Sequence, residues 1–160
     1  APAIILIIPL YIILTKLGLS GSYPGITAVF VMFMAPMTAW MMRGFFQDVP
    51  YELYESARID GCTKLGIMYR IVLPVVRPGV ASCAIFTFIT AWNEVLIPLV
   101  LSNSETGTLT MFVTTYATQY DVDFGGMAAA GIFTSIPGII LVIFFNRQLI
   151  DGLVEGAVKG

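Results

Sequence analysis

Long apolar segments, nearly free of charge, constrain this chain more than any other feature. They cover residues 2–15, 25–42, 79–101 and 127–145, and a helix needs about 20 such residues to cross a bilayer. Only 11% of the chain is charged and 58% is hydrophobic, against roughly 25% and 45–50% in a soluble domain. A soluble helical protein would need polar faces that these segments lack. The sequence therefore predicts an all-α membrane protein, a bundle of transmembrane helices.

The first segment is shorter than a complete span. The chain opens on it without an initiator methionine, a basic n-region or a small-residue cleavage site, so it does not read as a signal peptide. We therefore expect an N-terminally truncated, single transmembrane domain, with about four spans over residues 1–160.

The basic residues predict the orientation of the spans, because loops rich in Lys and Arg stay in the cytoplasm. The loop 102–126 contains none of them and only Lys16 lies elsewhere, so the loop 43–78 and the tail 146–160 are predicted to be cytoplasmic. The basic residues of that loop and tail are Arg43, Arg58, Lys64, Arg70, Arg77, Arg147 and Lys159.

Composition also excludes several kinds of site. A net charge of −2 offers no basic surface for nucleic acid. Cys62 and Cys83 have neither the number nor the spacing of a disulfide framework or a metal site, and we interpret them as small apolar residues. No G-x-x-x-x-G-K-[ST] phosphate loop occurs, so the chain is not expected to hydrolyse ATP.

Local signals predict a short helix over residues 50–60, inside the charged loop. Asp48 can cap it, Pro50 suits the first turn, and Glu52 favours the positive N-terminal end. Gly61 permits the left-handed turn that ends it. Three residues form an apolar side at fourfold spacing: Val49, Leu53 and Ala57.

A second helix is predicted over residues 62–73, because Pro74 and Pro78 disfavour its continuation. On the first helix, Glu55 and Arg58 are close enough to pair at i, i+3. A helix with one apolar and one charged side suits a cytoplasmic partner, but a solvated loop looks similar, and the local pattern leaves both open.

The stretch "ESARIDGCTKLGIMYRIVLP" resembles the EAA loop of ABC-transporter permease subunits. The family pattern is Glu-Ala-Ala, three residues, Gly, nine residues, Ile, one residue, Leu-Pro. The matching residues are Glu55, Ala57, Gly61, Ile71, Leu73 and Pro74, with Asp60 before the glycine as is common in the family. Ser56 replaces the second alanine, and Met68 stands where the family often has an aromatic residue.

Three further stretches, "VPYELYESARIDG", "AWNEVLIPLVL" and "GLVEGAVKG", are similar to the maltose-type carbohydrate-import permeases. This resemblance implies about six spans in the full chain, in a bacterial or archaeal cell membrane. It also implies a transport subunit rather than an enzyme, with ATP and Mg²⁺ bound by a partner ATPase dimer and no cofactor on this chain. The other implied partners are a second permease subunit in a heterodimer, an extracellular solute-binding protein, the sugar and membrane lipid.

The resemblance also implies roles for the loop residues in coupling to the ATPase. Glu55 would be a polar anchor, and the small side chains at 56 and 57 together with Gly61 would permit close approach. Leu73 and Pro74 would set the turn back into the membrane, after Ile71. Asp60 would either contact the partner or brace the turn. The tail is expected to contact the ATPase as well.

Polar residues near the predicted outer side are candidates for the substrate path. Trp92, Asn93 and Glu94 follow an apolar run, where ionisable groups are functional candidates, with interfacial anchoring or helix packing as the alternative. Tyr116 and Tyr120 lie near carboxylates, an arrangement that suits either a sugar or contact with the binding protein.

The sequence leaves two alternative functions open. EAA loops also occur in importers of amino acids, polyamines and ions. The "GLSG" at residues 18–21 matches the motif of rhomboid-type intramembrane serine proteases, with Ser20 as nominal nucleophile, but the chain has no histidine to act as its base.

Overall fold

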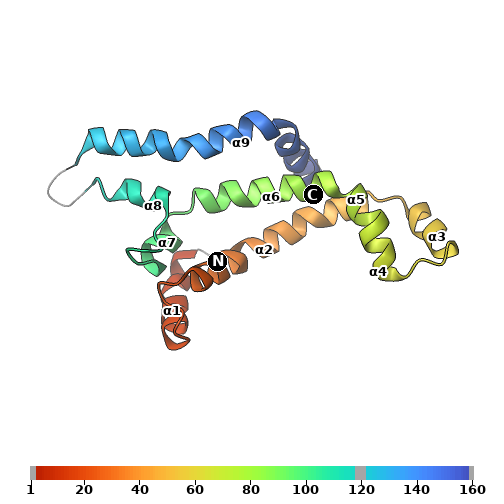
Figure 1. Ribbon diagram of the computed structural model, residues 1–160, viewed down its shortest axis with the longest axis horizontal. Coiled ribbons are helices and arrows are strands. Elements are labelled where there is room, and N and C mark those ends of the chain that lie inside the picture. The colour runs from red at the N-terminus through yellow and green to blue at the C-terminus, as the bar shows by residue number, and fades with distance from the viewer. Residues whose placement is uncertain (1–2, 118–121, 159–160) are drawn as a thin grey trace. The chain divides into compact units, whose positions relative to one another are not determined.

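The computed structural model describes residues 3–117 and 122–158, and side chains within residues 4–117 and 122–145. This part of the chain is helical and contains no strand (Figure 1), because backbone in a membrane must satisfy its own hydrogen bonds. The predicted all-α class is confirmed. In chain order the helices are α1 (Ala3–Lys16), α2 (Tyr23–Gln47), α3 (Tyr51–Ile59), α4 (Lys64–Ile67), the π-helical η1 (Met68–Val72), α5 (Leu73–Val75), α6 (Arg77–Trp92), α7 (Leu96–Leu101), α8 (Leu109–Thr114) and α9 (Phe124–Val158).

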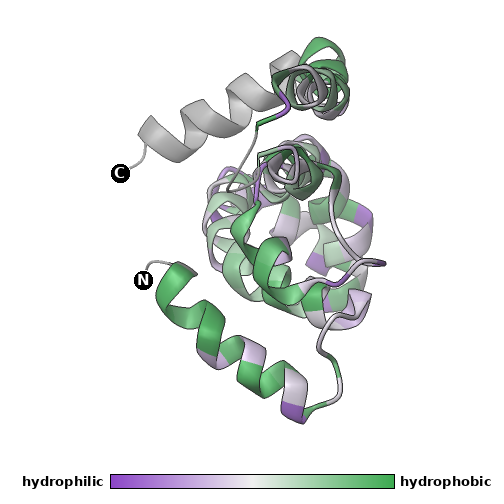
Figure 2. Ribbon diagram, turned by 90° about the vertical axis from the view of Figure 1, so that its left-hand side faces the viewer, coloured by the Kyte–Doolittle hydropathy of each residue, from purple (hydrophilic) through white to green (hydrophobic). Residues whose placement is uncertain are grey.

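Two helices in the described residues are long and apolar enough to cross a membrane. They are α2, with 25 residues, and the Phe124–Phe145 part of α9, with 22, and they contain the predicted segments 25–42 and 127–145. Helix α1 is apolar but shorter, and Figure 2 shows the hydrophobic colour along most of it. None of the side chains of Phe124–Phe145 is buried, so this apolar surface is left for lipid or another chain to cover.

The predicted span over residues 79–101 is not one continuous helix. Helix α6 ends at Trp92 and α7 begins at Leu96. On its other side, α6 meets the helical segment Lys64–Val75 at a bend of 71°, and this bent pair can form a third span. Hydropathy did not reveal the end of α6, because apolar residues resume directly after the polar pair Asn93 and Glu94.

The backbone of α9 leaves helical geometry at Phe145 (φ −125°, ψ 23°). Pro137 lies inside this helix, but the non-helical residue is eight positions further on. It coincides with the end of the predicted span. The chain then continues as helix to Val158, so the tail is a helix in the described residues.

The chain divides into two compact units, Ala1–Ala35 with Ile89–Ile140 and Pro36–Phe88 with Leu141–Gly160. In the first unit, Asn103 Nδ2 donates to the carbonyl oxygen of Gly21 at 3.0 Å, and Thr106 Oγ1 donates to the same oxygen at 3.1 Å. These bonds tie the turn before α2 to the loop after α7. The core of the unit joins α1, α2 and α7 through Ile7, Leu14, Ile26, Val29, Ile97 and Leu101.

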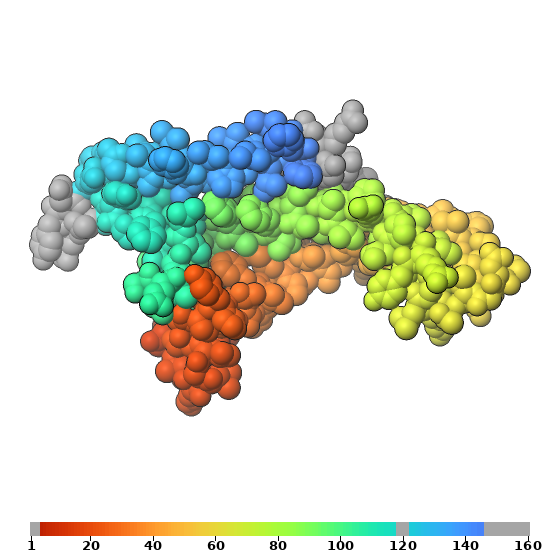
Figure 3. All heavy atoms as spheres, in the orientation of Figure 1, coloured from red at the N-terminus to blue at the C-terminus, as the bar shows by residue number. Residues whose placement is uncertain are grey.

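The second unit contains the charged loop, folded into a body that we call the 49–76 lobe, residues 49–76. Helices α3 and α4 pack together in it, seen in yellow and yellow-green in Figure 3. Where α6 begins, Gly79 is buried against the ring of Phe45 from α2. The buried cluster of the lobe is made by Val49, Ala57, Ile67, Val72 and Val76, and Met42, Phe45 and Phe46 of α2 pack against it.

Candidate functional site

Helix α3 forms where the sequence predicts it, but not with the predicted cap. Pro50 occupies the N-cap position in extended backbone (φ −57°, ψ 133°), and no side chain caps this end. Asp48, the predicted cap, lies two residues before this position. The chain is held here by burial of the preceding Val49. Glu52 in the first turn and Arg58 in the last complement the helix dipole.

Gly61 ends α3 with the left-handed backbone that the sequence predicts, at φ +76°. Its N–H donates to the carbonyl of Arg58 at 3.1 Å, and the N–H of Cys62 donates to that of Ala57 at 3.0 Å. This pair of bonds is a Schellman motif, which satisfies carbonyls that the helix end leaves free. The chain then enters α4, whose cap is Thr63, with Oγ1 accepting from Gly66 N at 3.1 Å.

The predicted stop of the second helix before Pro74 is wrong, because the helix continues to Val75. A π turn makes this possible: Leu73 N–H donates to the carbonyl of Met68, five residues back. Proline lacks an N–H and its ring clashes with the carbonyl four residues earlier in an α-helix. The wider π turn just before Pro74 relieves that conflict.

The predicted coupling residues differ in their exposure on the lobe. Glu55, Ser56, Asp60 and Gly61 are exposed on α3 and its terminal turn. Asp60 is the C-cap residue. In the described residues no ion pair joins Glu55 to Arg58, so the predicted i, i+3 pair is absent.

The other predicted residues serve the interior or the approach to α6. Ala57 is only 2% exposed, so the close approach that its small side chain allows is made by the lobe itself, not by a partner as predicted. Ile71 is half-buried against the same core. Leu73 and Pro74 are exposed and lie in the last turn before the 71° bend.

Sequence reasoning missed the exposed apolar residues of the lobe. Ile59 is 86% exposed at the end of α3, and Leu65 and Tyr69 are exposed on α4 and η1. A signal was available in the spacing of Leu65 and Tyr69, which are four residues apart and so fall on the same side of a helix, whereas a single exposed apolar residue is ordinary on a protein surface. The lobe thus presents carboxylates and apolar side chains together.

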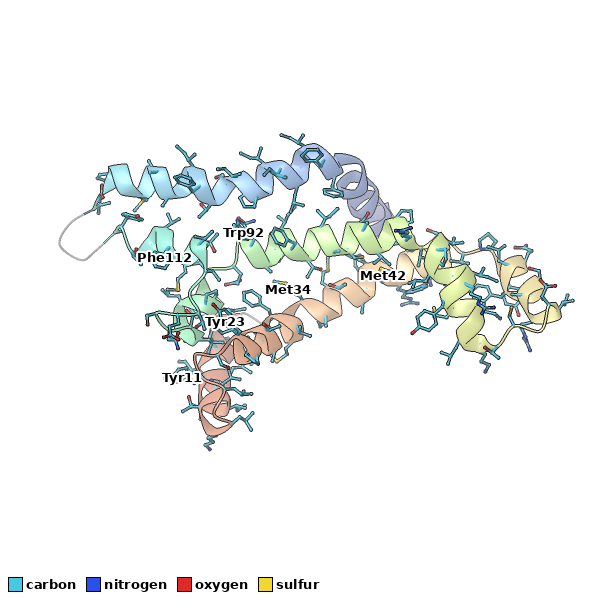
Figure 4. The ribbon with its side chains drawn as sticks, viewed as in Figure 1. Tyr11, Tyr23, Met34, Met42, Trp92 and Phe112 are labelled. Atoms are coloured by element: carbon cyan, nitrogen blue, oxygen red, sulfur yellow. The ribbon has the colours of Figure 1, made fainter. Side chains whose placement is uncertain are left out.

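Trp92 and the two polar residues that follow α6 all form hydrogen bonds within the chain. Trp92 lies at the end of α6 (Figure 4), and its Nε1–H donates to the carbonyl of Thr134 on α9 at 2.9 Å. Asn93 Nδ2 donates to the carbonyl of Ile89 at 2.8 Å. Glu94 Oε1 accepts from the N–H groups of Leu96 and Ile97, at 2.8 and 3.3 Å. These contacts favour the packing alternative.

Glu94 therefore caps α7. The effect of replacing it should depend on whether the new side chain keeps an oxygen that can accept these hydrogen bonds. We expect Glu94→Ala to cost ~0.5–2 kcal/mol of stability, as for other lost helix caps. Glu94→Gln keeps an oxygen at Oε1 and should retain most of it. Thermal unfolding of the purified full-length protein checks this. A Gln variant that loses as much stability as the Ala variant would contradict the capping role.

Tyr116 packs against the start of α9. A Cβ added at Gly126 would lie 2.5 Å from the Tyr116 ring, so this glycine is what allows the ring to approach. The Tyr116 carbonyl accepts from Asp123 N–H at 2.9 Å, and Asp123 Oδ1 accepts from Gly126 N–H at 2.9 Å. Tyr120, the other predicted aromatic, lies outside the described residues.

The nominal protease motif is a turn. Gly18 and Gly21 have φ of +69° and +67°, which explains both glycines by the left-handed backbone that they permit. Ser20 is exposed between them. Nothing in this turn prepares a nucleophile, since the sequence has no histidine.

The sequence of the chain matches a known protein family and several known proteins. The family model for the binding-protein-dependent transport system inner membrane component matches residues 1–153. The diacetylchitobiose uptake system permease protein DasC of Streptomyces coelicolor is 37% identical over 100% of the chain and 58% of its own length. The trehalose transport system permease protein SugB of Mycobacterium tuberculosis is 33% identical over 99% of the chain and 59% of its length.

A third relative, the arabinooligosaccharides transport system permease protein AraQ of Halalkalibacterium halodurans, is 37% identical over 99% of the chain and 57% of its length. The chain thus spans a little over half the length of these relatives. The match to the family model extends over both units and includes the whole 49–76 lobe. The chain belongs to the family of inner membrane components of binding-protein-dependent transport systems.

Proposed function

We propose that the full-length protein is a permease subunit of a binding-protein-dependent ABC importer for carbohydrates. It would form part of the sugar path through the membrane of a bacterial or archaeal cell. The relatives are named for diacetylchitobiose, trehalose and arabinooligosaccharides. All three are carbohydrates, which favours a sugar over an amino acid, a polyamine or an ion.

The observation that carries the coupling role is the 49–76 lobe. It is a packed body with its own buried cluster, and it presents the carboxylates of Glu55 and Asp60 beside the exposed side chain of Ile59. Such a surface suits a protein partner, whose contacts can match both charge and apolar area. That partner would be an ATPase dimer, which binds ATP and Mg²⁺ while this chain binds no cofactor.

The packing of the lobe suggests how motion of the ATPase would reach the membrane. Ala57 on α3 and Val76 at the start of α6 belong to the same buried cluster. A close-packed cluster moves as one body rather than deforming, so a displacement of α3 would be passed through Val76 to α6. ATP would drive this by stabilising one arrangement of the complex more than the other.

The remaining assignments follow from orientation. The basic residues of the loop 43–78 and the tail favour a cytoplasmic location for the lobe, and the opposite loops would meet the solute-binding protein. A second, different permease subunit would complete the path, and the exposed apolar surface of α9 leaves area for it or for lipid. Trp92 and Tyr116 remain candidates for contact with sugar or binding protein.

Purification of the full-length protein from its host membrane tests the proposal. We expect an ATP-binding subunit and a second permease subunit to co-purify, identified by mass spectrometry. Proteoliposomes containing the complex and the binding protein should accumulate a labelled di- or oligosaccharide only with ATP. Uptake of a labelled amino acid or polyamine instead would contradict the sugar assignment, and the absence of any ATPase would contradict the importer.

A further inference from the structure

The 49–76 lobe contains a hollow between α3 and the α4–η1 segment, with a volume of about 450 Å³. Ile67 and Val72, both buried, line it together with Met68. The rings of Tyr51 and Tyr54 lie on the α3 side, 6.3 Å apart between centroids. Its size lies in the range of about 300–1,000 Å³ that is typical of ligand sites.

Two cations complete the lining, Arg58 from α3 and Lys64 from α4. Both are exposed, and within the described residues no acidic side chain forms an ion pair with either. The hollow therefore combines apolar and aromatic lining with two uncompensated positive charges. A group that matches this lining would carry a negative charge on an apolar or aromatic stem.

We propose that this hollow is a socket for an acidic segment of the ATPase subunit, with a carboxylate between Arg58 and Lys64 and an adjacent apolar side chain against the exposed lining residues Tyr51 and Met68. This inference rests on the proposed function. It makes docking reciprocal, because the lobe would receive a part of its partner as well as present α3 to it.

The charges of the lobe favour a protein over an anionic lipid as the occupant. Glu52, Glu55 and Asp60 are exposed on the same short helix and its end, so a negatively charged membrane surface would be repelled next to the hollow. A protein surface can place charges of both signs in register with the lobe. The exposed side chains of Leu65 and Tyr69 nearby add apolar area that a protein would cover.

The test uses the full complex in lipid nanodiscs with a doubly charge-reversed variant, Arg58→Glu with Lys64→Glu. Truncating a buried charge contact at an interface weakens binding strongly, so we expect ATPase retention to fall roughly tenfold or more. The matched control is Arg70→Glu, which reverses an exposed charge of the same lobe outside the hollow and should change retention less than about twofold. Both sites are exposed, so neither variant should unfold the lobe.

A photo-crosslinking amino acid at Met68, which lines the hollow and is 42% exposed, identifies the occupant directly. Mass spectrometry should find the crosslink on an ATPase peptide that contains Asp or Glu. A crosslink only to lipid, or a retention defect seen only in nanodiscs with anionic lipid, would overturn the proposal. So would equal retention in the double variant and the Arg70→Glu control.

The two proposals fail in different ways. If the unaltered full-length protein captures no ATPase and transports no sugar, the proposed function itself is wrong. If it does both, and the double variant behaves as Arg70→Glu does, only the socket is wrong.

Discussion

Replacing Gly61 by valine is expected to abolish most ATP-driven uptake. Gly61 has φ of +76°, and nothing lies within 4 Å of where its Cβ would be, so the cost comes from the backbone and not from crowding. Left-handed backbone costs a residue that has a Cβ roughly 1–2 kcal/mol. A β-branched residue such as valine adopts this backbone especially poorly. Relief of this strain would break the Schellman bonds and reorient α3 against α4.

The measurement is ATPase retention and sugar uptake by the full complex, with two controls. Gly61→Asn should keep much of both activities, since asparagine tolerates left-handed backbone. Gly44→Ala, at a helical glycine whose Cβ would also meet nothing within 4 Å, should be neutral. A valine variant with normal uptake would show that the α3–α4 turn does not need its left-handed geometry for coupling.

Replacing Gly79 by alanine is expected to destabilise the contact between α2 and α6. A Cβ at this position would overlap the ring of Phe45, and Gly79 is buried. Forcing extra atoms into a packed contact costs roughly 1–3 kcal/mol, which should appear as a lower unfolding temperature and a faster thermal inactivation of the purified protein.

Phe45→Ala supplies the internal check. Because it removes the ring that the new methyl group would strike, the double variant should lose less stability than the sum of the two single variants. Gly138→Ala, in α9 with open space around its Cβ, should show no loss. An additive double variant would mean that the ring moves aside without cost and that Gly79 does not define this contact.

Local structure could be predicted well from the sequence where a single residue determines the backbone conformation. Gly61 is left-handed as expected, because few other residues adopt that conformation readily. The apolar side of α3 was also foreseen, since Ala57 is buried and Leu53 packs against the same cluster at the four-residue spacing of a helix; Val49 is buried as well, but it precedes the helix. The predicted spans 25–42 and 127–145 lie inside long apolar helices for the same local reason.

Predictions failed where two local rules competed. Pro74 was expected to stop a helix, but a π turn accommodates it, and no rule about proline alone says which solution the chain adopts. Apolar residues on both sides of Asn93 and Glu94 suggested one continuous helix. The carboxylate of Glu94 is instead better placed as the cap of a new one.

The sequence alone determined the helical class and the position of the motif-bearing loop, because both follow from apolar run lengths and from spacings within twenty residues. Only the tertiary structure decided which loop residues face inward. Ala57 and Glu55 are both at motif positions, yet one is enclosed by the lobe and the other is exposed. The side of a helix that becomes buried depends on the second element that packs against it, here η1 and Val76, and a one-dimensional pattern does not contain that choice.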